Sequence, residues 1–144
     1  MNVETILKGK GRAVVTIAPE ASVGAAITLL RQKSIGALVV SRDGATVVGI
    51  LSERDIIHAL ADRGAAATAA AAVAELMSRH VTTCTPQDGI AELMAEMTGR
   101  RIRHLPVIEA GRLAGIVSIG DVVKSRLDEV ESEASDLRQF IATA

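Results

Sequence analysis

The chain carries one set of landmarks twice, and this internal repeat limits its possible architectures more than any other feature. Prolines and turn glycines of the two halves lie 67 positions apart, while the glycine, serine and aspartate that follow lie 66 apart. The pairs are Pro19 with Pro86, Gly44 with Gly111, Gly49 with Gly115, Ser52 with Ser118 and Asp55 with Asp121. The second copy therefore lacks one residue in a turn, where a change of length is tolerated. Such a repeat predicts two similar units that pack together.

Hydrophobic periodicity predicts the order β-α-β-β-α in each copy, and therefore a mixed α/β (α+β) fold made of two tandem repeats. We expect the first repeat at 1–64, an alanine-rich linker at 65–72, the second repeat at 73–127 and an amphipathic C-terminal helix at 128–144. Strands are expected at 14–17, 38–40 and 47–51 in the first copy, and the second copy should begin with a strand at 81–84.

The expected C-terminal helix has an apolar stripe, made of Val130, Ala134, Leu137 and Ile141. A stripe with this spacing must be covered. It either packs back on its own domain or docks on a second subunit, and the sequence alone does not decide between the two.

Composition argues against several classes of function. Sixteen basic and 17 acidic residues give a net charge of −1, so no field favours nucleic acid or anionic lipid. The core-like run Ile35 to Val40 is far shorter than a membrane helix, and the N-terminus shows no apolar signal segment. Cys84 is the single cysteine, so no internal disulfide and no zinc-ligand spacing is present. We therefore expect a cytoplasmic protein in a reducing compartment, with no metal.

The repeated motifs resemble the cystathionine-β-synthase (CBS) domain pair, also called the Bateman module. Each half has a hydrophobic strand, ALVV at 37–40 and HLPV at 104–107, followed by spaced glycines and a Ser-x-x-Asp at the start of the last helix. The resemblance covers nearly the whole chain. It implies a regulatory module whose two clefts hold adenosine-containing ligands (AMP, ADP, ATP, NAD or S-adenosylmethionine), and usually a homodimer.

The two Ser-x-x-Asp motifs, at Ser52 to Asp55 and Ser118 to Asp121, have two interpretations. They can be capping boxes, in which serine and acid satisfy free N–H groups at a helix start. Alternatively, a carboxylate fixed at a strand-to-helix corner can accept hydrogen bonds from both ribose hydroxyls. The resemblance assigns the ribose to the aspartates and places the serine hydroxyls and the helix N-termini near phosphate.

The resemblance also implies that the two repeats pack about a pseudo-twofold axis, so that each cleft uses both copies. We call the cleft of Ser52 and Asp55 the first cleft and that of Ser118 and Asp121 the second cleft. The first cleft is expected to include Arg54, Thr83, Ile102, Arg103 and His104, and the second cleft Thr16, Ile35, Gly36, Ala37 and Ile116.

The copies differ in charge where they should meet the ligand. Ile35-Gly36-Ala37 is small and neutral, whereas the matching stretch from Arg100 to His104 holds three arginines and a histidine, and Arg54 corresponds to Gly120. This is either a solvated basic face or a phosphate site, since arginine suits bidentate phosphate contacts. The second interpretation predicts unequal clefts, one taking NAD or ATP and the other AMP.

The leading hypothesis is a sensor that binds adenine nucleotides and signals through dimer geometry or an unidentified regulated protein, without chemistry or a catalytic cofactor of its own. One alternative is a nucleotide-processing enzyme that uses Asp55 and Asp121 as general bases or metal ligands. Another is a structural adaptor with vestigial clefts. The basic run Lys8 to Arg12 lacks the pattern of a phosphate loop and is expected to be a mobile loop.

Overall fold

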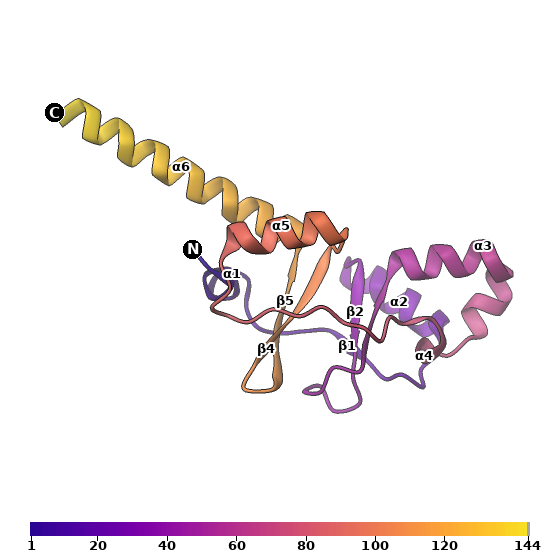
Figure 1. Cartoon of the computed structure of the whole chain (residues 1–144). Coiled ribbons are helices and arrows are strands. Elements are labelled where there is room, and N and C mark those ends of the chain that lie inside the picture. Colours follow the sequence, from indigo (N-terminus) through magenta and orange to yellow (C-terminus); the bar gives the residue numbers. More distant parts are fainter. Residues whose placement is uncertain (144) are drawn as a thin grey trace.

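The computed structural model describes residues 1–143 and contains two α/β units side by side, as the repeat predicts (Figure 1). The first unit comprises β1 (Thr16–Ile17), α2 (Val23–Lys33), β2 (Ala37–Val40), β3 (Gly49–Ser52) and α3 (Glu53–Ala70). The second comprises α5 (Ile90–Arg100), β4 (His104–Glu109), β5 (Arg112–Ser118) and α6 (Ile119–Thr143). Two further helices, α1 (Val3–Lys10) and α4 (Val73–Leu76), precede the two units in the chain.

Each unit has a small sheet with helices packed on it. In the first unit β2 lies between β1, to which it is parallel, and β3, to which it is antiparallel. All four residues of β2 are buried, as expected of a β-branched and aliphatic strand at the centre of a sheet. In the second unit β4 and β5 form an antiparallel hairpin.

The strand expected at 81–84 is wrong, because only a single bridge joins Cys84 to Val107. In the first unit the corresponding segment is β1, where Thr16 pairs with Val39 and Ile17 with Val40. Pro106 occupies the position that Val39 has in the first copy. Proline has no N–H to donate, so the ladder cannot extend beyond the bridge.

The two short leading helices are exchanged between the units. Val3 and Leu7 of α1 belong to the core of the second unit, and Val73 and Met77 belong to the core of the first. Matching backbone hydrogen bonds hold them: Val3 N–H donates to the carbonyl of Asp88, and Val73 N–H to that of Ala21. Each core is therefore completed by a segment that precedes the other unit in the chain, which ties the two repeats together.

A glycine in each unit permits this exchange. A Cβ on Gly115 would lie 2.7 Å from Leu7 Cδ2, and a Cβ on Gly49 would lie 2.5 Å from Met77 Sδ. Both distances are shorter than a normal Cβ contact, so a side chain at Gly115 or Gly49 would have to displace Leu7 or Met77.

The alanine-rich stretch and the C-terminal segment are both helical. α3 is broken at Gly64, where φ is +81°, and then continues to Ala70, with Thr68 fully buried. The expected C-terminal helix is the continuation of α6, which runs without interruption from Ile119 and projects away from both units (Figure 1). Across residues 1–143, none of the helices combines the length and the low charge content needed to cross a bilayer.

Candidate functional site

Both Ser-x-x-Asp motifs form the same corner between a strand and a helix. The N–H of Ser52 donates to Asp55 Oδ2 at 2.9 Å, and the N–H of Ser118 donates to Asp121 Oδ2 at 2.9 Å. In return, each aspartate N–H donates to its serine Oγ, at 3.4 Å for Asp55 and 3.2 Å for Asp121. The capping boxes are therefore real. Each capping box uses only Oδ2 of its carboxylate, and Oδ1 accepts no hydrogen bond from residues 1–143.

The first residue of α3 and the first residue of α6 each donate a backbone hydrogen bond to the residue that precedes β2 or β4. The N–H of Glu53 donates to the carbonyl of Gly36 at 2.9 Å, and the N–H of Ile119 donates to that of Arg103 at 2.8 Å. These bonds are equivalent in the two copies. They hold Gly36 and Arg103 beside the two corners, where the units meet.

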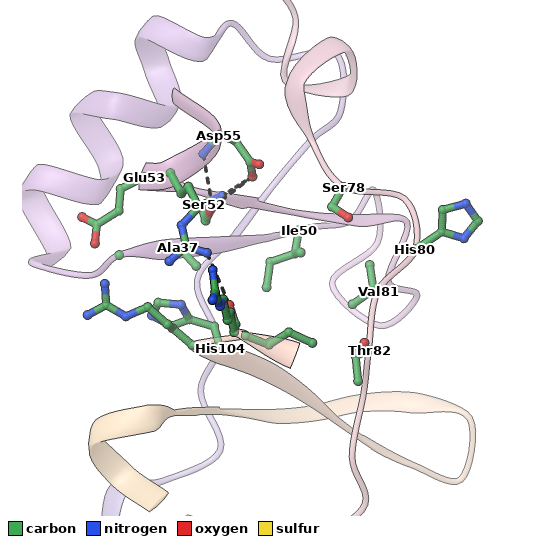
Figure 2. Close-up of a pocket in the computed structure, with 15 residues that line it drawn as sticks. Ala37, Ile50, Ser52, Glu53, Asp55, Ser78, His80, Val81, Thr82 and His104 are labelled. Atoms are coloured by element: carbon green, nitrogen blue, oxygen red, sulfur yellow. Dashed lines mark hydrogen bonds between the residues drawn. The ribbon is translucent and has the colours of Figure 1, made fainter. Parts of the chain in front are cut away.

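The first cleft is a pocket between the two units (Figure 2). Of the expected residues it brings together Ser52, Arg54, Asp55, Ile102, Arg103 and His104. Thr83 is exposed and does not line the pocket, whereas its neighbour Thr82 does. The structure adds residues that were not expected: Gly36, Ala37, Ile50, Glu53, Ser78, His80, Val81 and Arg101.

The lining of the first cleft is rich in basic groups. Arg54 donates from Nη1 to the carbonyl of Arg101 at 3.3 Å, which bridges the two units across the pocket. Arg103 lines the same wall. Burial lowers the pKa of His104, and the positive charge of Arg103 lowers it further. Both effects favour the neutral form of the His104 imidazole over the protonated form.

The second cleft lies on the other side of the same contact between units. It contains the expected Ile35, Gly36, Ala37, Ile116 and Ser118, together with Lys10, Ala13, Val14, Val15, Ser34 and His104. Thr16 is not among these residues; it pairs with Val39 in the sheet, and the preceding Val14 and Val15 line the cleft instead. Asp121 is absent from them too, since it borders a separate pocket between α1 and α6. Gly36, Ala37 and His104 line both clefts.

Lys10 separates Asp121 from the second cleft. Its Nζ lies 2.8 Å from Asp121 Oδ2 and 3.0 Å from the carbonyl oxygen of Ile116. Partial burial raises the pKa of Asp121, but the hydrogen bond and charge of Lys10 and the N–H of Ser118 outweigh this effect, so the pKa lies below its ordinary value. The carboxylate of Asp121 is therefore already paired with a positive charge, the ammonium group of Lys10.

The expectation of a mobile basic loop at Lys8 to Arg12 is wrong. Lys8 and Lys10 form the last turn of α1, Gly11 ends the helix with φ of +94°, and Arg12 pairs with Glu4 and Glu109. The signal for this helix is the pair Val3 and Leu7, four residues apart, followed by lysines that suit a helix C-terminus. His80 is the counterpart of Lys10 in the shorter α4 segment, and it makes no ion pair within residues 1–143.

The described residues offer little for covalent or metal chemistry. Within residues 1–143, no three His, Cys, Asp or Glu side chains gather as a candidate metal site. Burial raises the pKa of the Cys84 thiol to about 12, so it is not a thiolate nucleophile near neutral pH. The arrangement is suited to binding a polar, anionic ligand between two walls.

Comparison with known proteins agrees with the duplicated architecture. The CBS domain family model matches twice, over residues 11–62 and 73–128. The mitochondrial CBS domain-containing protein CBSX3 of Arabidopsis thaliana is 31% identical over 147 residues, covering 96% of this chain and 71% of its own. The crystal structure of the CBS-domain protein ATU1752 from Agrobacterium tumefaciens has a TM-score of 0.84 and 46% identity, over 88% of this chain and 99% of that one.

One similar structure contains adenosine derivatives. The CBS domain pair of protein MJ0100, in complex with 5′-methylthioadenosine and S-adenosyl-L-methionine, has a TM-score of 0.76 and 26% identity. The alignment covers 91% of this chain and 98% of that one.

Proposed function

The chain belongs to the CBS domain family as a tandem pair, and from this we propose that it is a sensor whose first cleft binds an adenosine-containing nucleotide. Its output is a change in dimer geometry or in the activity of a partner protein, with no reaction of its own. The regulatory role is inferred from the CBS pair. The choice of ligand is inferred from the residues that line the first cleft.

The observation that carries the proposal is the state of the Asp55 carboxylate. Its Oδ2 accepts from the N–H and the hydroxyl of Ser52, at 2.9 and 3.1 Å. Oδ1 accepts no hydrogen bond from residues 1–143, although Asp55 lines the pocket. A carboxylate held from one side, with its other oxygen available, is well arranged to accept hydrogen bonds from a ribose diol.

The rest of the first cleft suits the other parts of a nucleotide. Arg101, Arg103 and His104 supply positive charge for phosphates, and Arg54 is already positioned on the opposite wall. Ile50, Val81 and Ile102 provide aliphatic surface for a purine ring, which matters in a chain with 1% aromatic residues. The adenosine derivatives in the MJ0100 complex are in keeping with this choice. We assign the more anionic ligands, NAD or ATP, to this cleft.

We assign weaker binding, of AMP, to the second cleft. Its ribose carboxylate, Asp121, is paired with Lys10 through Oδ2, so a ribose has to share this carboxylate with an ammonium group. Gly36 and Ala37 replace the arginine-rich wall of the first cleft. Lys10 also lines the second cleft, where its ammonium group supplies one positive charge for a single phosphate. We therefore still expect AMP to bind there.

We also propose a homodimer in a reducing compartment such as the cytoplasm. The single cysteine is a buried free thiol, which needs no oxidising environment.

A thermal-shift panel tests the function as a whole. Wild-type protein is heated with AMP, ATP, NAD, adenosine or S-adenosylmethionine, and the solutions are then analysed by chromatography. At least one ligand should raise the melting temperature, with no turnover of any of them. If none raises it, a structural adaptor is favoured over a sensor; turnover would indicate an enzyme.

A further inference from the structure

The distal part of α6 presents an unpaired apolar stripe whose spacing differs from that of a simple surface helix. Its members follow each other at intervals of 4, 3, 4, 3 and 4 residues: Val123, Leu127, Val130, Ala134, Leu137 and Ile141. This is the 3.5-residue repeat of a coiled-coil seam, in which alternate positions are called a and d. Leu127, Ala134 and Ile141 occupy a positions, and the other three occupy d positions.

The stripe is exposed throughout. Its five larger members are between 39% and 65% exposed, and Phe140 beside it is 70% exposed. The helix uses a different side to contact its own unit: Val122 and Ser125 are buried, and Glu129 pairs with the amino group of Met1. Beyond Glu129 the helix extends away from the body of the protein (Figure 1). Packing of the stripe on its own domain, one of the two expectations, therefore does not occur within residues 1–143.

Charges beside the seam favour one occupant and one orientation. In a parallel pair, the residue before an a position meets the residue after a d position, five positions further along the second helix. This rule joins Glu133 to Arg138 of a second copy and Arg126 to Glu131 of a second copy. Both contacts are attractive, and each occurs twice in a symmetric pair.

The opposite orientation is disfavoured by the same residues. An antiparallel pair that kept all six layers together would set Glu133 against Glu133 and Glu131 against Glu131, and Lys124 against Arg138. Like charges at such positions are destabilising. The seam is therefore complementary to itself only when two copies run in the same direction, with both bodies at the N-terminal end of the pair.

From the spacing, the exposure and the charge pattern, we propose that residues 123–141 of α6 form a parallel two-stranded coiled coil with a second copy of this chain. The seam spans about 27 Å, at ~1.5 Å per residue. A coiled coil of this length is marginal when isolated. It therefore acts as a clamp that holds two modules in a fixed relative direction, beside any contact that the bodies make.

Engineered disulfides test the orientation and the occupant directly. In a Cys84→Ala background, the Ala134→Cys variant should give a covalent dimer under mild oxidation, since residue 134 faces its own copy in a parallel seam. The matched control is Ser132→Cys, on the outer face of the same helix, which should remain monomeric on a non-reducing gel. An Ala134→Cys protein that does not cross-link, or that cross-links no better than Ser132→Cys, overturns the proposal.

Charge reversal tests the proposed contacts independently, through the rate of cross-linking on the same kind of gel. Adding Glu133→Arg to the Ala134→Cys protein should slow cross-linking about 3-fold to 10-fold at low salt, because two attractive contacts become repulsive. Adding Arg138→Glu as well should restore the rate. Equal rates for all three proteins would contradict the assigned contacts. Neither experiment needs a nucleotide, so failure here is distinct from failure of nucleotide binding.

Discussion

The ammonium group of Lys10 lies 2.8 Å from Asp121 Oδ2, and this ion pair joins α1, which precedes the first unit, to α6 of the second unit. The stretch from Val3 to Pro19 is three residues longer than the corresponding stretch from Val73 to Pro86. The extra length lets α1 continue to Lys10, whereas α4 ends at Leu76. Asp121 thus has an ammonium partner that its counterpart Asp55 lacks among residues 1–143.

Removing the Lys10 ammonium should open the second cleft to an uncharged nucleoside. In an Asp55→Ala background, Lys10→Met should strengthen adenosine binding about 3-fold to 10-fold, because the ribose hydroxyls no longer compete with a cation for Asp121. Isothermal titration calorimetry measures the change. Lys8→Met, which removes the same charge from the exposed side of α1, should have no effect. Equal affinities with and without Lys10 would show that the ion pair does not control the cleft.

Binding of a dinucleotide should be linked to the protonation of His104. Burial, and next the charge of Arg103, lower the pKa of His104 in the empty protein. A pyrophosphate beside it should raise that pKa, so binding takes up a proton and NAD should bind more tightly at pH 6 than at pH 8. NAD is a suitable probe because its pyrophosphate does not titrate in this interval.

Calorimetry in two buffers of different ionisation enthalpy measures the proton uptake, and His104→Gln should abolish most of it. The same uptake in wild type and variant would place the pyrophosphate elsewhere. Without ligand the sign reverses: the unfolded chain binds the proton more readily than the folded one, so protonation costs stability as pH falls through the ordinary histidine range.

The exchanged helix α1 should make Gly115 intolerant of a side chain. Gly115→Ala is expected to lower the free energy of unfolding by about 1 to 3 kcal/mol, because its Cβ would lie 2.7 Å from Cδ2 of the buried Leu7. The cost should be smaller in a Leu7→Ala background. Gly99→Ala in α5, where a Cβ meets nothing within 4 Å, should be neutral or slightly stabilising. Urea denaturation of wild type, the three single variants and the Leu7→Ala/Gly115→Ala double variant measures these costs, and an undiminished cost without Leu7 would contradict the contact.

Cys84 should be chemically silent in the folded protein. It is buried, and its thiol pKa is raised to about 12, so almost no thiolate exists at pH 8. A thiol-reactive disulfide reagent should release less than about a tenth of one equivalent of chromophore from native protein, and one equivalent in denaturant. Full reaction under native conditions would mean that the second core opens readily.

The repeat was sufficient to predict the order of elements and the two corners, because strand, turn and cap signals are local. It was not sufficient for the exchange of α1 and α4, since a helix with two core residues does not reveal which core it joins. Pro106 shows the same limit: its effect on the 81–84 segment depends on a strand pairing between distant residues. Only the three-dimensional contacts assign Val3 and Leu7 to the second unit.

The candidate site was predictable to a similar extent. Residues within the motifs, such as Ser52 and Asp55, lie where the motif requires them. The expected Thr83 is one residue out of position, because residues 81–83 do not form a strand and their side chains do not alternate as in one. Thr82 therefore lines the first cleft and Thr83 does not. The role of Lys10 was missed because its partner, Asp121, lies 111 positions away in the chain.

The central claim is that the Asp55 carboxylate holds a ribose in the first cleft, and calorimetric titration of Asp55→Ala against wild type tests it most directly. With NAD or ATP as titrant, Asp55→Ala should weaken the tighter binding event about 5-fold to 150-fold, equivalent to about 1 to 3 kcal/mol. Asp121→Ala should leave that event unchanged and weaken only the other. If both variants bind as wild type does, the two aspartates are helix caps alone and the proposed function is wrong.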